Sequence, residues 1–390
     1  MAGALLVLNA GSSSLKFAVF AGDEGPPAMT HRGSIDDIGR HASFHVRAAP
    51  DPARRVARDT RARDHEEALD GLLQWLDAEG LAIDVAGHRV VHGGAEFARP
   101  VRVDDAVLAA LERLVPLSPL HQPHSLAGVR ALAVLRPEMP QVACFDTAFH
   151  HTLPPVAQHF ALPRALRDRG MRRYGFHGLS YEHIAGVLPD YLGEAADGAV
   201  VVAHLGHGAS LCAMRARCSV ETSMSFTPLD GIPMGTRCGA LDPGVLLHLL
   251  RAEGMGLDDL DELLHHHAGL LGVSGLSADV RVLEASDNPH AAEALALFAY
   301  RVAQAVAAHA VAAGGLDALV FTAGIGEHAQ AVRAAICRHL AWLGVALDDA
   351  ANARNGPRLT TPASRVSAWV IPTDEEAVIA QHAWRLAQRV

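Results

Sequence analysis

Two turns rich in glycine and serine contain residue types suited to holding phosphate. The first runs from Gly11 to Ser14 and is followed by Lys16, and the second runs from His204 to Gly208. Small residues let several backbone N–H groups converge on a phosphate, while serine hydroxyls add donors and lysine adds a positive charge. Both turns are therefore candidate phosphate sites, although a plain hairpin turn would use the same residue types.

Neither turn matches a common nucleotide-binding fingerprint. GxxxxGK[ST] is absent from both, so neither is a P-loop. Gly324-Ile325-Gly326 is followed by Ala329 where the dinucleotide fingerprint requires glycine, and it comes late in the chain. The sequence thus argues against a pyridine-nucleotide dehydrogenase.

The histidines do not predict a transition-metal site. His121 with His124, the pair His150-His151 and the run 265–267 lack a cysteine or third carboxylate at zinc spacing. We interpret 265–267 as an exposed helix end, where imidazolium is favourable against the helix dipole. The five cysteines form no CxxC pair, which indicates neither a disulfide framework nor structural zinc and fits a reducing compartment.

Alternating strands and helices must position these residues. Leu5 to Leu8 and Phe17 to Phe20 are short apolar runs that predict strands on either side of the first turn. Asp64 and Glu67 predict a helix start, and a second, long helix is expected from Asn288-Pro289 to Gly314-Gly315. The run 316–321 then predicts a strand that leads into the glycine turn at 324–326. This alternation is typical of the α/β class.

The two phosphate-like turns sit in similar surroundings. Residues 7–15 and 202–211 both read as apolar strand, small-residue turn and apolar strand, almost half a chain apart. Such an echo favours two duplicated domains, although chance similarity of two hairpins would give the same pattern.

Length and composition restrict the class of protein. A chain of 390 residues, half of them apolar, predicts about two globular domains. The net charge of −10 disfavours nucleic acid or an anionic membrane as main partner. The start of the chain lacks a basic segment and a long apolar run, so we expect a first strand there, and a soluble cytoplasmic protein.

A series of motifs covers essentially the whole chain in order. These are NAGSSSLKF from Asn9, GHRVVHGG from Gly87, PLHQPH from Pro119, FDTAFHHTLPP from Phe145, YGFHG from Tyr174, HLGHGAS from His204, SMSFTPLDG from Ser223, MGTRCGALDPG from Met234, GVSGLSADVR from Gly272, FTAGIGEH from Phe321 and PTDEE from Pro372. In order and spacing the series resembles the acetate kinase family, within the superfamily of acetate and sugar kinases, Hsc70 and actin. The resemblance implies reversible transfer of the γ-phosphoryl of ATP to acetate, giving acetyl phosphate and ADP.

The resemblance also implies the catalytic residues. Arg89 and Arg237 match the two active-site arginines, His177 matches the histidine that stabilises the transition state, and Asp146 matches the acidic active-site residue. A guanidinium suits both a carboxylate and a transferring phosphoryl group. Asp146 need not act as a base, because acetate is already ionised at neutral pH.

Binding residues follow from the same resemblance. Asn9 and Glu375 match the site for Mg²⁺, with Mn²⁺ as an alternative, and hard oxygen ligands suit that ion. The acetate methyl pocket matches Val91, Leu120, Phe176 and Pro228, and one methylene there is worth only about 1–3 kcal/mol, so preference over propionate is graded. The implied nucleotide and phosphate contacts are Ser12, Ser14, Lys16, His204, Leu205, Gly206, His207, Gly208, Asp279, Val280, Arg281, Gly324, Ile325, Gly326, Glu327 and His328.

Six positions depart from the family pattern. His207, His328, Asp374 and Gln122 replace asparagine, Leu179 replaces threonine, and Ser225 replaces glycine. Most of these concern nucleotide or phosphate contacts, so altered ATP affinity or another donor such as pyrophosphate is an alternative. His207 would make phosphate binding pH-dependent near neutrality, because histidine titrates there.

The expected fold is two duplicated actin-like, ribonuclease H-like domains with mixed sheets flanking a nucleotide cleft. The N-terminal domain should span 1–148 and about 376–390, and the C-terminal nucleotide-binding domain 149–375. The resemblance implies a homodimer that acts on acetate and ATP. The alternatives are a propionate or other short-chain acyl kinase, and a non-catalytic actin-like nucleotide-binding protein.

Overall fold

The chain forms two compact units. The computed structural model describes residues 3–22, 27–49, 51 and 53–388. One unit comprises 1–148 with 374–390, and the other comprises 149–373. The chain returns to the N-terminal unit at Asp374, two residues before the position expected from the sequence, and the ends of that expected domain at 1–2 and 389–390 lie outside the described residues.

The N-terminal unit is built on one mixed sheet. The strand order is β5-β4-β3-β2-β1-β6-β8-β7, with β1, β6 and β8 parallel and the other neighbours antiparallel. The strands are β1 Gly3–Ala10, β2 Leu15–Gly22, β3 Ala28–Asp36, β4 Ser43–Ala48, β5 Arg55–Asp59, β6 Ile83–Val90, β7 Val101–Arg102 and β8 Gln141–Phe145. The helices are α1 His65–Ala78, α2 Asp105–Glu112, the 3-10 turn η1 Val115–Leu117, α3 Gln122–Leu135 and α14 Glu375–Ala387.

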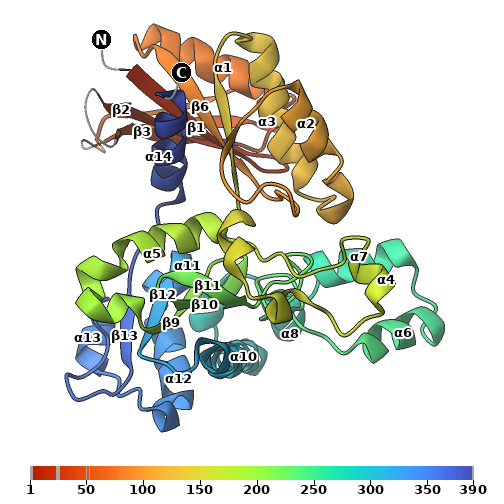
Figure 1. The fold of residues 1–390 in the computed structure, drawn as a ribbon, viewed down its shortest axis with the longest axis vertical. Coiled ribbons are helices and arrows are strands. Elements are labelled where there is room, and N and C mark those ends of the chain that lie inside the picture. The colour runs from red at the N-terminus through yellow and green to blue at the C-terminus, as the bar shows by residue number, and fades with distance from the viewer. Residues whose placement is uncertain (1–2, 23–26, 50, 52, 389–390) are drawn as a thin grey trace. The chain divides into compact units, whose positions relative to one another are not determined.

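Helices cover both faces of this sheet (Figure 1). On one face, α1 and α3 pack over a core that includes Leu6, Phe17 and Leu72. On the other, α14 crosses β1, β6 and β8. This helix lies close because position 87 is glycine: a Cβ there would lie 2.6 Å from Cγ2 of Ile379. The close approach fixes the start of α14 beside the ends of the parallel strands.

The C-terminal unit repeats the same core. Its sheet has the order β11-β10-β9-β12-β13, with β9, β12 and β13 parallel and the others antiparallel. The strands are β9 Ala199–Leu205, β10 Ala209–Arg215, β11 Cys218–Thr222, β12 Ala318–Thr322 and β13 Ser367–Val370. When only the five central strands of each sheet are numbered along the chain (β1, β2, β3, β6, β8 and β9 to β13), both sheets have the order 3-2-1-4-5. The two hairpins that the sequence echo singled out, β1-β2 and β9-β10, occupy the same place in the two sheets.

The other elements of this unit are helical. They are η2 Ala148–Thr152, η3 Pro155–Gln158, α4 Arg164–Arg167, α5 Gly178–Leu192, η4 Gly193–Asp197, α6 Pro243–Arg251, α7 Leu257–His266, α8 Gly269–Ser274, α9 Val280–Glu284, α10 Pro289–Ala313, α11 Ala323–His328, α12 Gln330–His339, η5 Ala341–Leu343 and α13 Asp349–Ala353. α5 and α10 pack on opposite sides of the sheet (Figure 1).

Local signals set the helix ends that the sequence predicted. Asp64 caps α1 by accepting a hydrogen bond from the backbone N–H of Glu67 at 2.9 Å. Asn288 caps α10 in the same way, and Gly314 ends that helix in the left-handed conformation at φ +72°. His265 and His266 form the last turn of α7, as expected.

α10 is the one described helix long and apolar enough, by length and composition, to cross a membrane. It contains Glu293 and Arg301, and it buries Phe298, Val302 and Val306 in the protein. Its contacts with β9 and β10 are those of a core helix.

Candidate active site

Arg89 and Asp146 form a buried ion pair where two parallel strands end. Arg89 lies near the end of β6, and Asp146 directly follows β8. The Nε and Nη2 atoms of Arg89 donate to the two carboxylate oxygens of Asp146 at 3.0 and 2.6 Å. Asp146 is 1% exposed, so its buried negative charge is stabilised by this bidentate contact and not by water. Burial opposes the positive charge of Arg89, but Asp146 and Glu375 outweigh it and raise the pKa of the guanidinium.

Asn9 and Glu375 lie beside this pair. Oδ1 of Asn9, near the end of β1, accepts from Nη1 of Arg89 at 3.4 Å. Oε2 of Glu375, the first residue of α14, lies 3.7 Å from Nε of Arg89. Burial raises the pKa of the Glu375 carboxyl, whereas Arg89 acts against that rise. Four predicted site residues from three strands and one helix thus meet at one edge of the N-terminal sheet.

The oxygen atoms of this group suit a hard divalent cation. Asn9 supplies an amide oxygen and Glu375 a carboxylate, both close to the same guanidinium. The described residues contain no group of three or more His, Cys, Asp or Glu side chains placed to hold a metal. Mg²⁺ needs few protein ligands, because water and phosphate oxygens complete its octahedron. Asn9 and Glu375 therefore fit such an ion as partial ligands.

The first glycine-serine turn belongs to the same unit. Ser12 is exposed in the turn between β1 and β2, and the backbone N–H of Gly11 donates to the carbonyl of Ser14 at 2.8 Å. Lys16 is exposed on β2, directly opposite Asn9 in the strand pairing. The turn is thus a tight hairpin whose polar side chains lie next to the Asn9 end of β1.

In the C-terminal unit, His177 sits at a strained position before α5. Its backbone has φ +58°, in the left-handed region. Its Nδ1 lies 2.8 Å from Oγ of Ser210, which also bonds the hydroxyl of Tyr181 at 2.5 Å. The ring stacks on His204 with centroids 4.3 Å apart, and Nδ1 of His204 lies 2.8 Å from Oγ of Ser180. These contacts fix the orientation of both imidazoles.

Gly208 allows Arg237 to approach His177. A Cβ at Gly208 would lie 2.9 Å from Nη2 of Arg237 and 3.4 Å from Nε2 of His177. Arg237 also donates from Nη1 to the carbonyl of Pro228 at 2.7 Å, and burial lowers the pKa of its guanidinium. The structure therefore brings His177, Arg237 and the backbone of the second glycine turn together.

Some of the predicted nucleotide-binding residues lie in this turn or in the helix next to it. The backbone of Gly206 lies against Ala323, the first residue of α11, since a Cβ on Gly206 would be 3.7 Å from that of Ala323. His207 packs against Gly235, and burial lowers the pKa of His207 below 6.5, with Arg237 adding to the effect. The GIGEH segment is the short helix α11, which contacts β9 and β12.

Asp279 and Arg281 pair with each other at the start of α9. Asp279 caps the helix, and Nη2 of Arg281 donates to Oδ2 of Asp279 at 2.6 Å. The hydrogen bonds from Arg281 lower the pKa of Asp279 to about 2. Arg281 is otherwise exposed to solvent, so it is available to a ligand.

The four predicted acceptor-pocket residues divide between the two units. Val91 follows β6 and is buried, and Leu120 is 37% exposed, both in the N-terminal unit. Phe176 and Pro228 are buried in the C-terminal unit. Phe176 directly precedes His177, and Pro228 accepts the hydrogen bond of Arg237.

Three of the unusual residues have structural contacts that explain them. Gln122 is buried and bonds both the backbone N–H of His92 (3.1 Å) and its carbonyl (3.0 Å), which secures the VVHGG loop. Asp374 caps α14 by accepting from the N–H of Ala377 at 3.0 Å. Ser225 donates to Asp230. An asparagine and an aspartate cap helices equally well, so Asp374 preserves the start of the helix that carries Glu375.

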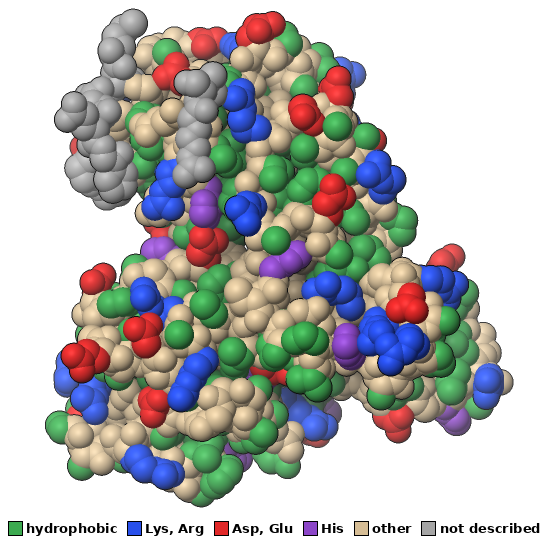
Figure 2. Space-filling view, in the orientation of Figure 1, with side chains coloured by type: hydrophobic (Ala, Val, Ile, Leu, Met, Phe, Trp, Pro, Cys, Tyr) green, Lys and Arg blue, Asp and Glu red, His purple; other side chains and the backbone are tan. Residues whose placement is uncertain are grey.

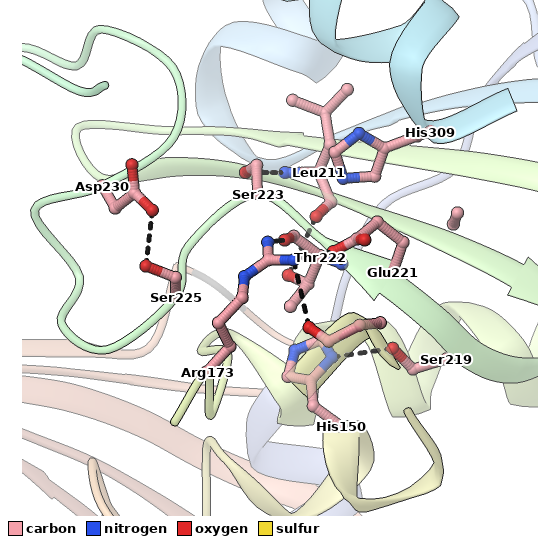
Figure 3. Close-up of polar contacts among 12 residues, drawn as sticks. His150, Arg173, Leu211, Ser219, Glu221, Thr222, Ser223, Ser225, Asp230 and His309 are labelled. Atoms are coloured by element: carbon pink, nitrogen blue, oxygen red, sulfur yellow. Dashed lines mark hydrogen bonds and ion pairs between the residues drawn. The ribbon is translucent and has the colours of Figure 1, made fainter. Parts of the chain in front are cut away.

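His150 is a buried support that the sequence considered only as a metal ligand. Its Nδ1 lies 2.9 Å from Oγ of Ser219 (Figure 3). Its Nε2 lies 2.9 Å from the carbonyl oxygen of Phe176. Burial lowers the pKa of His150 to about 4, so the ring is neutral. Because a carbonyl only accepts, Nε2 carries the proton and Nδ1 accepts from Ser219. His150 thereby holds the residue that precedes His177.

Arg173 secures the other end of the same loop. Its Nη1 pairs with Glu221 at 2.7 Å, and its Nη2 donates to the carbonyl of Thr222 (Figure 3). The backbone N–H groups of Tyr174 and Gly175 donate to the carbonyl of Ser225. No sequence motif indicated these contacts, because the partners lie some fifty residues apart in the chain.

Comparison with known proteins agrees with this geometry. The profile of the Acetokinase family matches residues 4–381. The chain is 52% identical over 394 residues to an acetate kinase of Rhodopseudomonas palustris, covering 99% of both chains. It is 43% identical to a propionate kinase of Yersinia enterocolitica, covering 98% of this chain and 95% of that one.

Solved structures give the same result. A crystal structure of Porphyromonas gingivalis acetate kinase matches with a TM-score of 0.89 at 35% identity, covering 98% of this chain and 99% of the other. A propionate kinase from Francisella tularensis matches with a TM-score of 0.92 at 34% identity, with the same coverage. The expected actin-like fold with two mixed α/β sheets is thereby confirmed. The chain belongs to the Acetokinase family.

Proposed function

We propose that this protein is an acetate kinase that transfers the γ-phosphoryl group of ATP to acetate, reversibly, giving acetyl phosphate and ADP. The observation that carries the proposal is the Arg89–Asp146 pair beside Asn9 and Glu375, in a chain half identical to an acetate kinase along its whole length. A protein that only bound a nucleotide would have no use for a buried, carboxylate-locked arginine next to cation ligands.

Charge neutralisation and alignment are the main tasks in such a transfer. Acetate is already ionised at neutral pH, so a carboxylate oxygen attacks the phosphorus directly and no base is required. Both oxygens of Asp146 are committed to Arg89, which makes Asp146 a positioning residue. Arg89 keeps N–H groups beyond those contacts, and its exposed fifth gives an anionic substrate access to them.

We assign the C-terminal group to the phosphoryl donor. The guanidinium of Arg237 and the imidazole of His177 both lie close to the backbone of Gly208, so positive charge and side-chain N–H groups are gathered at this turn. Donors fixed before the reaction stabilise developing charge without reorganisation. The remaining predicted contacts, Asp279 to Arg281 and Gly324 to His328, are proposed to hold the nucleotide.

A divalent cation is expected in this family, and we propose Mg²⁺, with Mn²⁺ as an alternative. Asn9 and Glu375 would hold it, and when bound it would neutralise charge on the phosphate oxygens. Helix α14 presents Glu375 at its first position, where the helix dipole favours a negative charge.

Propionate is a second candidate acceptor. Relatives named propionate kinase share 43% identity with this chain over nearly its whole length. One extra methylene changes binding in a small apolar pocket by only about 1–3 kcal/mol. The acceptor preference is therefore a matter of degree.

We further propose a homodimer in the cytoplasm. Helix α6 has no buried residue, and its apolar side chains Val245 and Leu247 are 40% and 46% exposed to solvent. Exposed apolar side chains on one helix are typical of a surface covered by another subunit. Elsewhere charges of both signs are scattered over the visible surface (Figure 2), and nothing in that pattern favours nucleic acid or a membrane.

The proposed reaction is tested by an acyl phosphate assay with hydroxylamine trapping. We expect hydroxamate when the purified protein receives Mg-ATP and acetate, a weaker but measurable signal with propionate, and little with butyrate. Pyrophosphate in place of ATP is the control for the donor. Hydroxamate with pyrophosphate and not with ATP would contradict the donor assignment, and its absence with every donor and acceptor would refute the function.

The pH dependence of nucleotide binding tests the role of His207. Because burial places its pKa below 6.5, the imidazole is neutral at pH 7 and gains a proton on the acid side of neutrality, not at it. The added positive charge should strengthen phosphate binding, so the nucleotide KM of wild type divided by that of His207→Asn should fall as the pH drops below about 6.5. The ratio removes the titration of ATP itself. A ratio independent of pH would exclude His207 from phosphate binding.

Two isosteric variants test whether His150 positions Phe176 and His177. The amide nitrogen of His150→Gln can replace Nε2 and still donate to the carbonyl of Phe176, whereas that of His150→Asn replaces Nδ1 and cannot. We expect His150→Gln to keep most of the turnover and His150→Asn to lose about tenfold to a hundredfold in kcat, since small displacements of a catalytic group have effects of that size. Thermal unfolding of both variants separates this effect from a loss of stability. Equal kcat values for the two would show that the Phe176 contact has no part in catalysis.

A further inference from the structure

The N-terminal unit has a basic cavity that shares Lys16 with the site described above and otherwise lies outside it. The cavity holds about 660 Å³ and lies over strands β2 to β5, next to the first turn of α14. Its lining includes Lys16, Arg32, Arg47, Arg55 and Glu376, together with His45. Four permanent positive charges therefore share this space with one carboxylate, in a chain whose net charge is −10.

Three of these arginines form a row across adjacent strands. In the strand pairing, Arg32 of β3 lies opposite Arg47 of β4, and Arg47 lies opposite Arg55 of β5. Like charges directly opposite each other on one face of a sheet repel and destabilise the pairing. We call Arg32, Arg47 and Arg55 the arginine row. Because Arg47 and Arg55 are exposed to solvent, an anion can reach the row and relieve this repulsion.

The neighbouring carboxylates neutralise the row only in part. Arg32 pairs with Glu376 of α14. In the described part of the chain, neither Arg47 nor Arg55 forms an ion pair with a carboxylate. Asp36 and Asp59 lie two rows away along the same face, with His45 and Ser34 in the row between, and neither lines the cavity.

We propose that the arginine row is a second anion site, which binds a multiply charged phosphate such as an oligophosphate. One guanidinium group can donate two parallel hydrogen bonds to a phosphate. Neighbouring strands lie about 4.8 Å apart, so three arginines in a line match a ligand whose negative charges are spaced along a chain. Lys16 closes the end of the cavity nearest the catalytic group, because it lies opposite Asn9. The site therefore belongs to the N-terminal unit and lies beside the proposed cation ligand Asn9.

The Arg32–Glu376 pair connects this site with α14. Glu376 follows Glu375, the proposed cation ligand, in the first turn of the helix. A phosphate bound to the arginine row would compete with Glu376 for Arg32. Binding of the phosphate would therefore leave the carboxylate next to Glu375 without its positive partner. The double variant below leaves Arg32 and Glu376 in place and removes only the outer part of the row.

Calorimetry with inorganic tripolyphosphate tests the proposal. Titrations are run with ADP at saturation, so that the nucleotide site is filled. We expect wild type to bind tripolyphosphate and the variant Arg47→Gln/Arg55→Gln to bind it at least about tenfold more weakly, because the variant lacks two guanidinium groups that would bond phosphate oxygens. Turnover of the double variant should equal that of wild type, which distinguishes this site from the catalytic one.

A matched control lies on the same strand. Arg58 of β5 points to the opposite face, where its guanidinium lies 5.0 Å from the ring centre of Phe44. Arg58→Gln makes the same charge change as Arg55→Gln, and we expect tripolyphosphate binding to weaken only in the latter. No binding to wild type, equal binding to wild type and the double variant, or equal weakening by Arg58→Gln and Arg55→Gln would each overturn the proposal.

Discussion

A buried carboxylate whose two oxygens are both bonded to one arginine organises the site residues of the N-terminal unit. Asp146 is 1% exposed, and its two oxygens are bonded to Arg89. The contact exists because β6 and β8 are parallel neighbours, so residues at their carboxyl ends meet at one edge of the sheet. Breaking it would leave a charge buried without a partner, at a cost of about 3–5 kcal/mol. The position of Arg89, and through it the contacts to Asn9 and Glu375, follows from this requirement.

Duplication explains how one architecture supplies two kinds of chemistry. The five central strands of each sheet share the order 3-2-1-4-5, and the first two of them form a hairpin. In the N-terminal unit, β6 carries Arg89 and β8 leads into Asp146, and this pair, which suits a carboxylate substrate, lies beside the proposed cation ligands Asn9 and Glu375. In the C-terminal unit the hairpin turn itself carries Gly208, which admits Arg237 and His177 to its backbone. The fold is shared, and the function depends on which strand ends carry charge.

Sequence alone predicts the features that depend on neighbours in the chain. Asp64, Asn288 and Gly314 set helix ends through contacts within a few residues, and both hairpins follow from apolar runs around small residues. The positions of Arg89, Asp146, His177 and Arg237 came from resemblance, and their pairing required the strand order. His150 was missed as a support because its partners, Ser219 and Phe176, lie 69 and 26 residues away. Asp374 was one of the replacements of asparagine that raised another phosphoryl donor as an alternative, whereas the structure gives it a capping contact. Gln122, another such replacement, has a buried packing role.

The central claim is that Arg89 and Asp146 act as one unit in phosphorylating acetate, and a double-mutant cycle on turnover tests it most directly. The quantity to measure is kcat with ATP and acetate for Arg89→Ala, Asp146→Ala and the double variant, with unfolding curves to confirm that each is folded. The account predicts that kcat falls by about the same factor in the double variant as in Arg89→Ala alone, because Asp146 serves only to hold that arginine. Losses that multiply in the double variant would show that the two side chains act independently and would contradict the account.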